Sequence, residues 1–313
     1  MKALFITSTR IGDAVLSTSV LNYIIKIYPG SSVYLATGED PSSLFRDFQN
    51  VKKIYILKKK KFKFHWFELW YQAIFFQWDL VVDLRGSMIS HFLYAKKKYI
   101  YKSNNKYLHI LDEFSSLLRI KRINYPSISI NKKILFKAKK NSLGFRNIIA
   151  IGASANWPAK VWPAKKFAKL IKLLLKNNNF GKNATIVFFG SSKDTKDTKK
   201  IINFLKNKNI KNLCGGLNLL EVYAYIKQCK IFIGNDSGLM HIAAASGICT
   251  LGLFGPSLES RYAPKGKKAY FIRTKKSYKS LTGNKNFDWN TKKNLMNSLS
   301  VSMVYKKICK ILK

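Results

Sequence analysis

Asp236, Ser237, Gly238 and His241 place a carboxylate, a hydroxyl, a glycine and an imidazole within one short stretch of the chain. The stretch, residues 232–257, reads FIGNDSGLMHIAAASGICTLGLFGPS; its apolar start predicts a buried strand and its alanine-rich run a tightly packed helix. A strand-to-helix junction presents backbone N–H groups and the positive helix end, which favour a phosphate or a polyhydroxylated ligand. The alternative is that Asp236 and Ser237 only cap the helix and His241 is a core residue.

Asp13 offers a second carboxylate, in the turn between the first predicted strand and the first predicted helix. A helix N-terminus keeps such a carboxylate ionised, as a general base that deprotonates a hydroxyl must be. Gly12, directly before it, would let the backbone approach a ligand closely. The alternative is a helix-capping aspartate.

Lys160 lies in the loop IGASANWPAKVWPAKK, which also contains Ser154 and Asn156 and precedes a predicted helix. An ammonium at this position could neutralise a diphosphate leaving group. The alternative is one more solvated lysine, but Trp157 and Trp162 indicate an ordered, packed loop.

Gly190, Ser191 and Ser192 follow another predicted strand, ATIVFFG, and open a helix. Their backbone could hold a ribose or a base, although this pattern by itself is common. The chain has four cysteines, with no CxxC pair and no histidine at metal-ligand spacing. We therefore expect free thiols in a reducing cytoplasm and no metal site.

The elements that must position these residues alternate between strand and helix. A first series contains KALFITS, AVLSTSVLNYIIKIY, SVYLAT, PSSLFRDF, KIYIL, DLVVDL and SMISHFLYAKK, and a second runs from NIIAIG to CTLGLFG. This alternation predicts an α/β protein with mostly parallel sheets, whose ligand sites lie outside the carboxyl ends of the strands. Residues 121–145 are basic and irregular and predict a linker, so we expect domains at 1–140 and 141–313.

Charge is the outlier in the composition. The 313 residues include 57 Lys and Arg against 15 Asp and Glu, a net charge of +42. Such a charge attracts anionic polymers or membranes, but lysines spread through every segment are equally typical of a solvated surface. A nucleic-acid-binding protein is the competing function class, although no RRM, KH or zinc-finger pattern supports it. A Rossmann oxidoreductase is disfavoured because no GxGxxG follows the first strand.

Four motifs follow the order seen in the lipopolysaccharide heptosyltransferases: STRIGDAVLSTSVLNYIIKIYP, WDLVVDLRGSMIS, GAS…AKVWPAKKFAKL and GNDSGLMHIAAASG…GLFGPS. The chain thus resembles glycosyltransferase family 9 over nearly its whole length. The resemblance implies a GT-B fold, in which two Rossmann-like domains face each other across an interdomain cleft. It also implies inverting, metal-independent transfer, without a cofactor, of a heptose from ADP-heptose to the inner core of lipopolysaccharide.

The resemblance also implies roles for single residues. Asp13 matches the family's proposed catalytic base, and Lys160 matches the lysine that meets the donor phosphates. The Asp-Ser-Gly-x-x-His motif of residues 236–241 matches the motif that binds the donor's sugar and diphosphate. The N-terminal domain would then bind the acceptor and the C-terminal domain the donor, with the last helix packing back on the N-terminal domain. The other donor-side candidates are Ser154, Asn156, Gly190, Ser191 and Ser192, and the acceptor-side loop candidates are Arg10 and Gly12.

The match has two gaps. Ser191 and Ser192 stand where many relatives carry an acidic residue near the ribose, and residues 275–294 lack the cysteines common in relatives. The choice of nucleotide is therefore open, and a GT-B glycosyltransferase with another nucleotide-sugar donor is the alternative function.

An acceptor built on lipid A and Kdo implies work at the cytoplasmic face of the inner membrane. Arg10 and Asp13 interrupt the apolar N-terminus before a signal peptide forms, and the acidic and amide residues within WFELWYQAIFFQWDLVVDL disfavour a spanning helix. We therefore expect a cytoplasmic, peripheral membrane protein with no specific nucleic-acid partner. Residues 57–80 mix lysines with aromatic residues and could dock on the membrane; the alternative is a solvated basic loop before a helix whose aromatics pack on the sheet.

Overall fold

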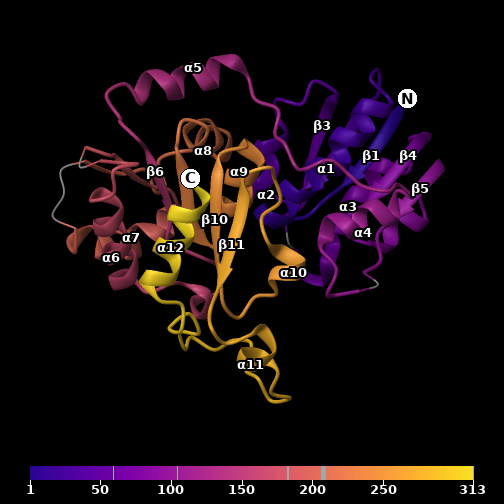
Figure 1. Ribbon diagram of the computed structural model, residues 1–313. Helices are drawn as coiled ribbons and strands as arrows, with labels where there is room; N and C mark the ends of the chain where they lie inside the picture. The colour runs from indigo at the N-terminus through magenta and orange to yellow at the C-terminus, as the bar shows by residue number, and fades with distance from the viewer. Residues whose placement is uncertain (59, 104, 182, 206–208, 313) are drawn as a thin grey trace. The chain divides into compact units, whose positions relative to one another are not determined.

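The computed structural model describes residues 1–58, 60–103, 105–181, 183–205 and 209–312. The chain forms two compact units, Met1–Asn131 and Lys132–Lys313, each built around one parallel sheet (Figure 1). The predicted α/β class with two parallel sheets is confirmed. The first unit ends at Asn131, whereas the sequence placed the boundary at residue 140.

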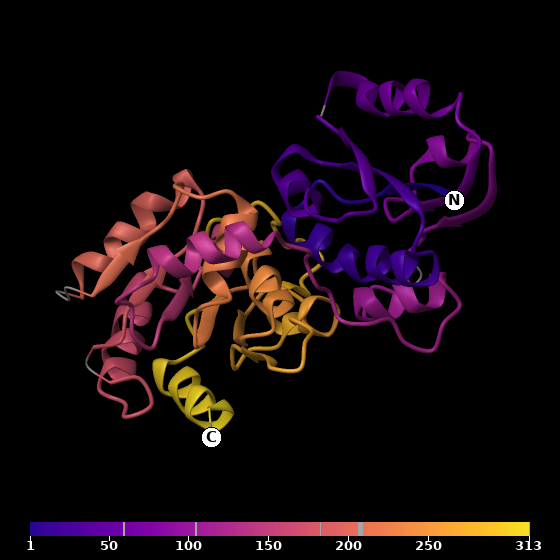
Figure 2. The same ribbon diagram turned by 90° about the horizontal axis from the view of Figure 1, so that it is seen from above.

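The first unit has five parallel strands in the order β3-β2-β1-β4-β5. Figure 2 shows helix α3 on one face of this sheet, with α1 and α4 on the opposite face. The inner strands β1 and β4 carry continuous runs of buried residues, since a parallel strand covered by helices on both faces must be apolar on both. The elements are β1 Lys2–Ile6, α1 Ile11–Ile27, β2 Ser32–Thr37, α2 Glu39–Ser42, η1 Ser43–Phe45, β3 Val51–Ile56, η2 Lys61–Lys63, α3 Phe64–Ala73, β4 Trp78–Asp83, η3 Met88–His91, β5 Ala95–Ile100 and α4 Ile110–Leu117.

The second unit has six parallel strands in the order β11-β10-β9-β6-β7-β8. Helices α6, α7 and α12 pack together over a core on one face, while α5 and α9 both pack against α8. The elements are α5 Lys132–Asn141, β6 Ile149–Gly152, η4 Pro158–Lys160, α6 Ala164–Leu175, β7 Ile186–Phe188, η5 Ser192–Asp194, α7 Thr195–Asn203, β8 Ile210–Asn212, α8 Leu219–Ile226, β9 Ile231–Asn235, α9 Gly238–Ser246, β10 Cys249–Phe254, α10 Glu259–Tyr262, β11 Ala269–Arg273, α11 Tyr278–Thr282 and α12 Val301–Ile311.

Both sheets reverse their strand order beside their first strand. In the first unit β1 lies between β2 and β4, and in the second unit β6 lies between β7 and β9. At such a switch point the chain leaves adjacent strand ends in opposite directions and opens a crevice for a ligand. The loops after β1, β4, β6 and β9 are therefore the places where each unit can build a site.

Two sequence expectations are wrong. The expected linker at 121–145 contains helix α5, whose Ala138 is buried and whose other positions are largely lysine. The lysine-rich composition hid this narrow apolar face from the sequence analysis. The helix expected after β4 is also absent, because the hydroxyl groups of Ser87 and Ser90 bond to the Asp83 carboxylate instead and leave only the short η3 before strand β5.

Helix α12 places Val304 and Ile308 in the core of the second unit and packs on α6. The four cysteines are free thiols, as expected. Among the described residues, no group of three or more His, Cys, Asp and Glu side chains could hold a metal ion. No described helix is both long enough and apolar enough to cross a bilayer.

The buried thiols of Cys229 and Cys249 allow a test of how strongly burial lowers their reactivity. Burial raises the pKa of both thiols, that of Cys249 to about 11. Only the thiolate reacts, so at pH 8 we expect both cysteines to react with iodoacetamide at least about 100-fold more slowly in the native chain than in the unfolded chain. Peptide mapping by mass spectrometry gives the rate at each site, and labelling of native Cys249 at the unfolded rate would contradict the raised pKa of its thiol.

Candidate functional site

The donor-side candidates follow the carboxyl ends of neighbouring strands in the second unit. Strands β9, β6 and β7 are adjacent, and the loops after them carry Asp236, Ser154 and Gly190. Neighbouring strands lie about 4.8 Å apart, so the ends of β9 and β7 are about 10 Å apart. One edge of the sheet thus collects the predicted residues in a row that can span an extended ligand such as a nucleotide sugar.

Lys160 and Asp236 form an ion pair, with 3.1 Å between Nζ and Oδ2. Their side chains are 15% and 9% exposed, so water screens the pair little. The attraction between the charges offsets the cost of removing both from water, whereas loss of either partner leaves an uncompensated charge. The structure therefore brings together the lysine and the aspartate of the predicted donor site.

Asn235 holds the loop that carries Lys160. Its buried side chain accepts a hydrogen bond from Trp162 N at 2.9 Å and donates one to Ala153 O at 2.7 Å. These two bonds fix the start and the end of the loop against the end of β9. Asn235 is not among the residues predicted from the sequence, although an amide side chain at the end of a buried apolar strand must find hydrogen-bond partners.

Residues 287–299 contact the same loop and hold it in place. The indole of Trp157 packs with Phe287 and Trp289, at ring-centroid distances of 6.2 and 5.9 Å. The region that lacks the relatives' cysteines thus supports the loop through hydrogen bonds and aromatic packing. The bonds run from Trp157 Nε1 to Thr291 O, from Leu295 N to Ala159 O, from Asn294 Nδ2 to Val161 O, and from Trp162 Nε1 to Leu299 O.

The start of helix α9 carries a buried hydroxyl group that no described residue satisfies. Ser237 occupies the N-cap position with extended backbone, but its side chain makes no capping hydrogen bond. Its Oγ is buried and has no hydrogen-bond partner among the described residues, and the same holds for Ser257 Oγ after the adjacent strand β10. A buried hydroxyl without a partner is costly, and a bound ligand could remove that cost. The capping alternative is therefore wrong for Ser237, and Ser257 is a candidate that the sequence analysis quoted only within its motif.

His241 lies in the first turn of α9 and is 5% exposed. Its position one turn after Ser237 agrees with the predicted helix. Of the two loop candidates after β6, Ser154 is half-buried and Asn156 is exposed.

The Asp194 carboxylate lies against the turn at Gly190, Ser191 and Ser192. Oδ2 of Asp194 accepts hydrogen bonds from Ser191 N at 2.7 Å and from Ser191 Oγ at 2.8 Å. A Cβ atom on Gly190 would lie 2.9 Å from Asp194 Cβ, so this close approach requires glycine. Asp194, at the end of η5, thus forms a capping box with Ser191 that fixes the geometry of the turn.

On the first unit, Asp13 lies in the first turn of α1, where Arg10 is the N-cap residue. Asp13 is half-buried, and its Oδ2 lies 3.5 Å from Ser8 Oγ, which in turn accepts a hydrogen bond from Arg10 N. Asp13 is therefore not the capping residue that the alternative required. Gly12 is half-buried next to it, and the Arg10 side chain is exposed.

The Arg85 side chain lies beside this loop, just after the end of the neighbouring strand β4. Buried Asp83 accepts hydrogen bonds from Arg85 N at 2.8 Å, Ser87 N at 2.7 Å and Ser90 Oγ at 2.7 Å, which fixes the turn after β4. The Arg85 guanidinium then lies 3.4 Å from Thr9 Oγ1 and over the Trp66 ring. Arg85 is a further candidate that the sequence analysis included in a motif without a role.

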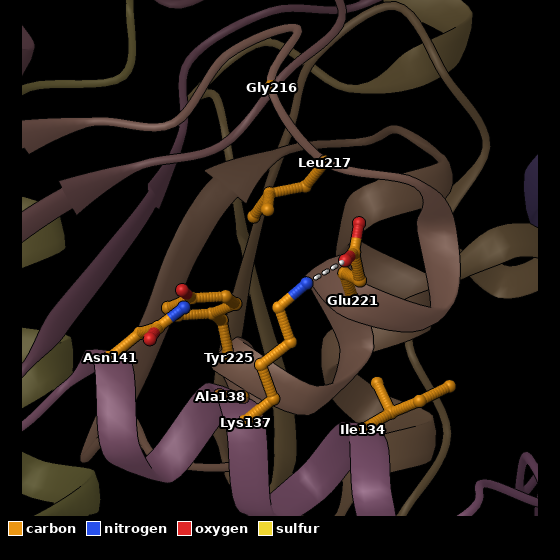
Figure 3. Close-up of a pocket in the computed structure, with 8 residues that line it drawn as sticks. All are labelled: Ile134, Lys137, Ala138, Asn141, Gly216, Leu217, Glu221 and Tyr225. Atoms are coloured by element: carbon orange, nitrogen blue, oxygen red, sulfur yellow. Dashed lines mark hydrogen bonds and ion pairs between the residues drawn. The ribbon is translucent and has the colours of Figure 1, made fainter.

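A separate pocket on the second unit lies between α5 and α8 (Figure 3). The Lys137 ammonium and the Glu221 carboxylate pair across it at 3.5 Å. Its volume of about 140 Å³ is below the roughly 300 Å³ of the smallest usual ligand sites. It contains none of the predicted site residues, and we interpret it as a gap in the packing of α5 on α8. Its lining residues are Ile134, Lys137, Ala138, Asn141, Gly216, Leu217, Glu221 and Tyr225.

Comparison with known proteins gives one consistent family. The model of glycosyltransferase family 9 (heptosyltransferase) matches residues 82–288. The lipooligosaccharide heptosyltransferase 2 of Campylobacter jejuni serotype O:6 is 29% identical over 287 residues, which cover 84% of each chain. The lipopolysaccharide heptosyltransferase 2 of Escherichia coli K12 is 36% identical over 119 residues, which cover 37% of this chain and 33% of that protein.

Two solved structures share the fold over the whole chain. The glycosyltransferase family 9 protein of Veillonella parvula superposes with a TM-score of 0.80 at 20% identity, covering 99% of this chain and 97% of that one. E. coli ADP-heptose lps heptosyltransferase II superposes with a TM-score of 0.78 at 20% identity, covering 100% and 98%. The two sheets with their switch-point loops, together with the family match over most of the chain, lead to one assignment: the chain is a GT-B glycosyltransferase and belongs to glycosyltransferase family 9, the heptosyltransferase family.

Proposed function

We propose that the second unit binds ADP-heptose. The observation that carries this proposal is the Lys160–Asp236 pair beside the start of α9, where Ser237 Oγ is buried without a partner among the described residues. A cation, helix N–H groups and a hydroxyl suit a diphosphate, and the carboxylate suits sugar hydroxyls. The solved E. coli heptosyltransferase WaaC, described with ADP and with ADP-2-deoxy-2-fluoro heptose, supports the same donor.

The proposed reaction is a direct displacement with inversion at the anomeric carbon. Asp13 takes the proton of the acceptor hydroxyl as the hydroxyl oxygen attacks that carbon. The new glycosidic C–O bond forms while the bond to the diphosphate breaks, and ADP leaves with the electron pair. Lys160 and the N–H groups at the start of α9 stabilise the charge that develops on the diphosphate. Asp236 and His241 hold the donor, and every step uses side chains and backbone of this chain without a metal ion.

We propose that the acceptor is a Kdo-bearing lipid A of the lipopolysaccharide inner core, met at the cytoplasmic face of the membrane. The relatives' names as lipopolysaccharide and lipooligosaccharide heptosyltransferases support this acceptor class. Arg10 and Arg85 beside the Asp13 loop suit an acidic sugar, because a guanidinium binds a carboxylate or a phosphate through paired hydrogen bonds.

Replacement of the donor-site lysine tests the donor. We expect ADP and ADP-heptose to raise the melting temperature of the protein, and Lys160→Gln to weaken ADP binding at least about tenfold, because the diphosphate loses a buried charged partner. Thermal shift against a panel of ADP, UDP, GDP and CMP sugars measures both effects. Lys165→Gln, an exposed lysine five positions on, is the matched control and should bind as the wild type does. A preference for another nucleotide would overturn the donor, and no response to any nucleotide would overturn the donor site.

Removal of the proposed base tests the mechanism. Asp13→Asn keeps the shape of the side chain but cannot accept the acceptor proton, so we expect kcat to fall by about 10²–10⁴-fold while ADP affinity is unchanged. Turnover with ADP-heptose and Kdo-lipid A, beside calorimetric ADP binding, separates the two quantities. Asp112→Asn removes an exposed acid from the first turn of α4 in the same unit and controls for loss of charge at a helix start. Equal kcat losses in both variants would remove Asp13 from the base role.

The role of Asn235 in positioning Lys160 gives a third prediction. Asn235→Ala removes two buried hydrogen bonds and leaves Trp162 N unpaired, so we expect a loss of about 2 kcal/mol in unfolding free energy together with weaker ADP binding. Urea unfolding and calorimetry give the two values. Asn212→Ala, at the end of strand β8 with one exposed bond to Cys214 N, should change both quantities little. Wild-type ADP affinity in Asn235→Ala would show that the loop keeps its geometry without this side chain.

A further inference from the structure

Helix α3 in the first unit has two apolar faces. One is buried: Leu69 and Ala73 belong to the core cluster beneath the sheet, and Trp66 and Trp70 pack against that cluster. A surface helix needs only one such face, with polar residues on the other. The second apolar face of α3 therefore calls for a separate physical reason.

The second face is a stripe of exposed aromatic rings. Its residues recur at intervals of three and four positions, so they line one side of the helix and continue just past its end. The rings of Phe64 and Phe67 lie 5.4 Å apart and those of Tyr71 and Phe75 lie 5.9 Å apart, which makes the stripe continuous at both ends. The exposed fractions are 55% for Phe64, 53% for Phe67, 60% for Tyr71 and 80% for Phe75.

Segments next to α3 also carry exposed apolar side chains. Phe62, just before the helix, is completely exposed and has a left-handed backbone at φ 51°, which a bulky residue rarely adopts. The short helix η3 packs against α3 and adds exposed apolar side chains on and directly after it. We call the whole set the α3 aromatic surface; it consists of Phe62, Phe64, Phe67, Tyr71, Phe75, Met88, Phe92 and Tyr94.

Exposed lysines lie next to the α3 aromatic surface in the chain. Lys58, Lys60, Lys61 and Lys63 precede the helix and are exposed, and Lys98 reaches the η3 segment through a hydrogen bond to His91 O. Lys59, in the same run, lies outside the described residues. Two of these lysines form ion pairs, Lys58 with Glu39 and Lys60 with Glu68. The surface therefore combines exposed aromatic rings with an excess of positive charge at its edge.

We propose that the α3 aromatic surface docks the protein on an anionic lipid bilayer. Aromatic rings partition into the boundary between headgroups and acyl chains, and the adjacent lysines match the negative headgroups. Helix α3 then lies in the plane of the membrane, with Leu69 and Ala73 still facing its own sheet. A second copy of the chain is a poorer partner, because a two-fold interface on this surface would bring Lys58, Lys61 and Lys63 close to the same lysines of the other copy.

This inference rests on the proposed function only in the choice of a bacterial type of lipid. Binding to vesicles is measured without transfer of a sugar. Vesicle binding can therefore be absent while the transferase mechanism holds, and it can be present while that mechanism is wrong. The ADP thermal shift of each variant reports separately that the second unit is folded and able to bind its donor.

Vesicle sedimentation tests the proposal with the full chain. Phe67→Gln/Tyr71→Gln/Phe75→Gln keeps every lysine and uses a good helix former at exposed positions. We expect its partition coefficient on vesicles of phosphatidylglycerol and phosphatidylethanolamine to fall at least tenfold, with an unchanged ADP shift. Lys61→Gln/Lys63→Gln should lower the partition coefficient severalfold and flatten its dependence on salt. Wild-type protein should bind phosphatidylcholine vesicles far less.

Matched controls come from helix α5 of the other unit, which is also rich in lysine. Phe136 on α5 is 71% exposed and Leu143, just after this helix, is 73% exposed, so Phe136→Gln/Leu143→Gln removes exposed apolar groups. Lys139→Gln/Lys140→Gln removes two exposed lysines of the same helix. Both controls should sediment within twofold of the wild type. Wild-type sedimentation of the triple glutamine variant, equal losses in the α5 controls, or a triple variant that changes only dimer formation or RNA retention would each overturn the proposal.

Discussion

The two hydrogen bonds of the Asn235 side chain are the constraint on which the donor side of this protein depends. The bonds tie the end of β9 to both ends of the loop after β6, and that loop carries Lys160. Asp236 is the next residue after Asn235, so the side chain that fixes the loop also fixes where the ammonium meets the carboxylate. A buried amide whose donor and acceptor are both satisfied stabilises one geometry, because any shift of the loop leaves a polar group unpaired.

The two units solve the same physical problem in the same way. In each unit, charged site residues follow the first strand and the neighbouring strand across the switch point: β1 and β4 in the first, β6 and β9 in the second. A polar side chain at the end of the neighbouring strand fixes a loop there, which is the turn after β4 in the first unit and the loop after β6 in the second. Asp83 does so with backbone N–H and serine hydroxyl groups, and Asn235 does so with one backbone N–H group and one carbonyl. Charged side chains, Arg85 and Lys160, are held at these turns as a result.

The sequence predicts well the strands and helices that depend on a pattern of apolar residues. It predicts poorly the turns and site residues that depend on single polar contacts. The buried strands and the helix after Ser237 are visible because period and composition agree over several residues. Helix α5 was missed because its apolar face is narrow among lysines, and the turn after Asp83 was mistaken for a helix because its serines bond to a carboxylate. Asn235, Arg85 and Asp194 acquire their roles only through partners distant in the sequence or through turn geometry, and a linear pattern does not record these contacts.

The brace on the Lys160 loop has a consequence for biosynthesis. The residues of segment 291–299 that bond through side chains to the loop lie 133 to 137 positions after their partners, so the ribosome synthesises the loop long before this segment. Domains fold as units and largely in the order of synthesis, so the first unit can acquire its structure while the second is still being translated. The nascent second unit can pair its strands β6, β7 and β9, and Asn235 can hold both ends of the Lys160 loop, before residues 291–299 are synthesised. The outer hydrogen bonds of the loop form only after that later segment has been made, so the loop reaches its full set of contacts in two separate steps.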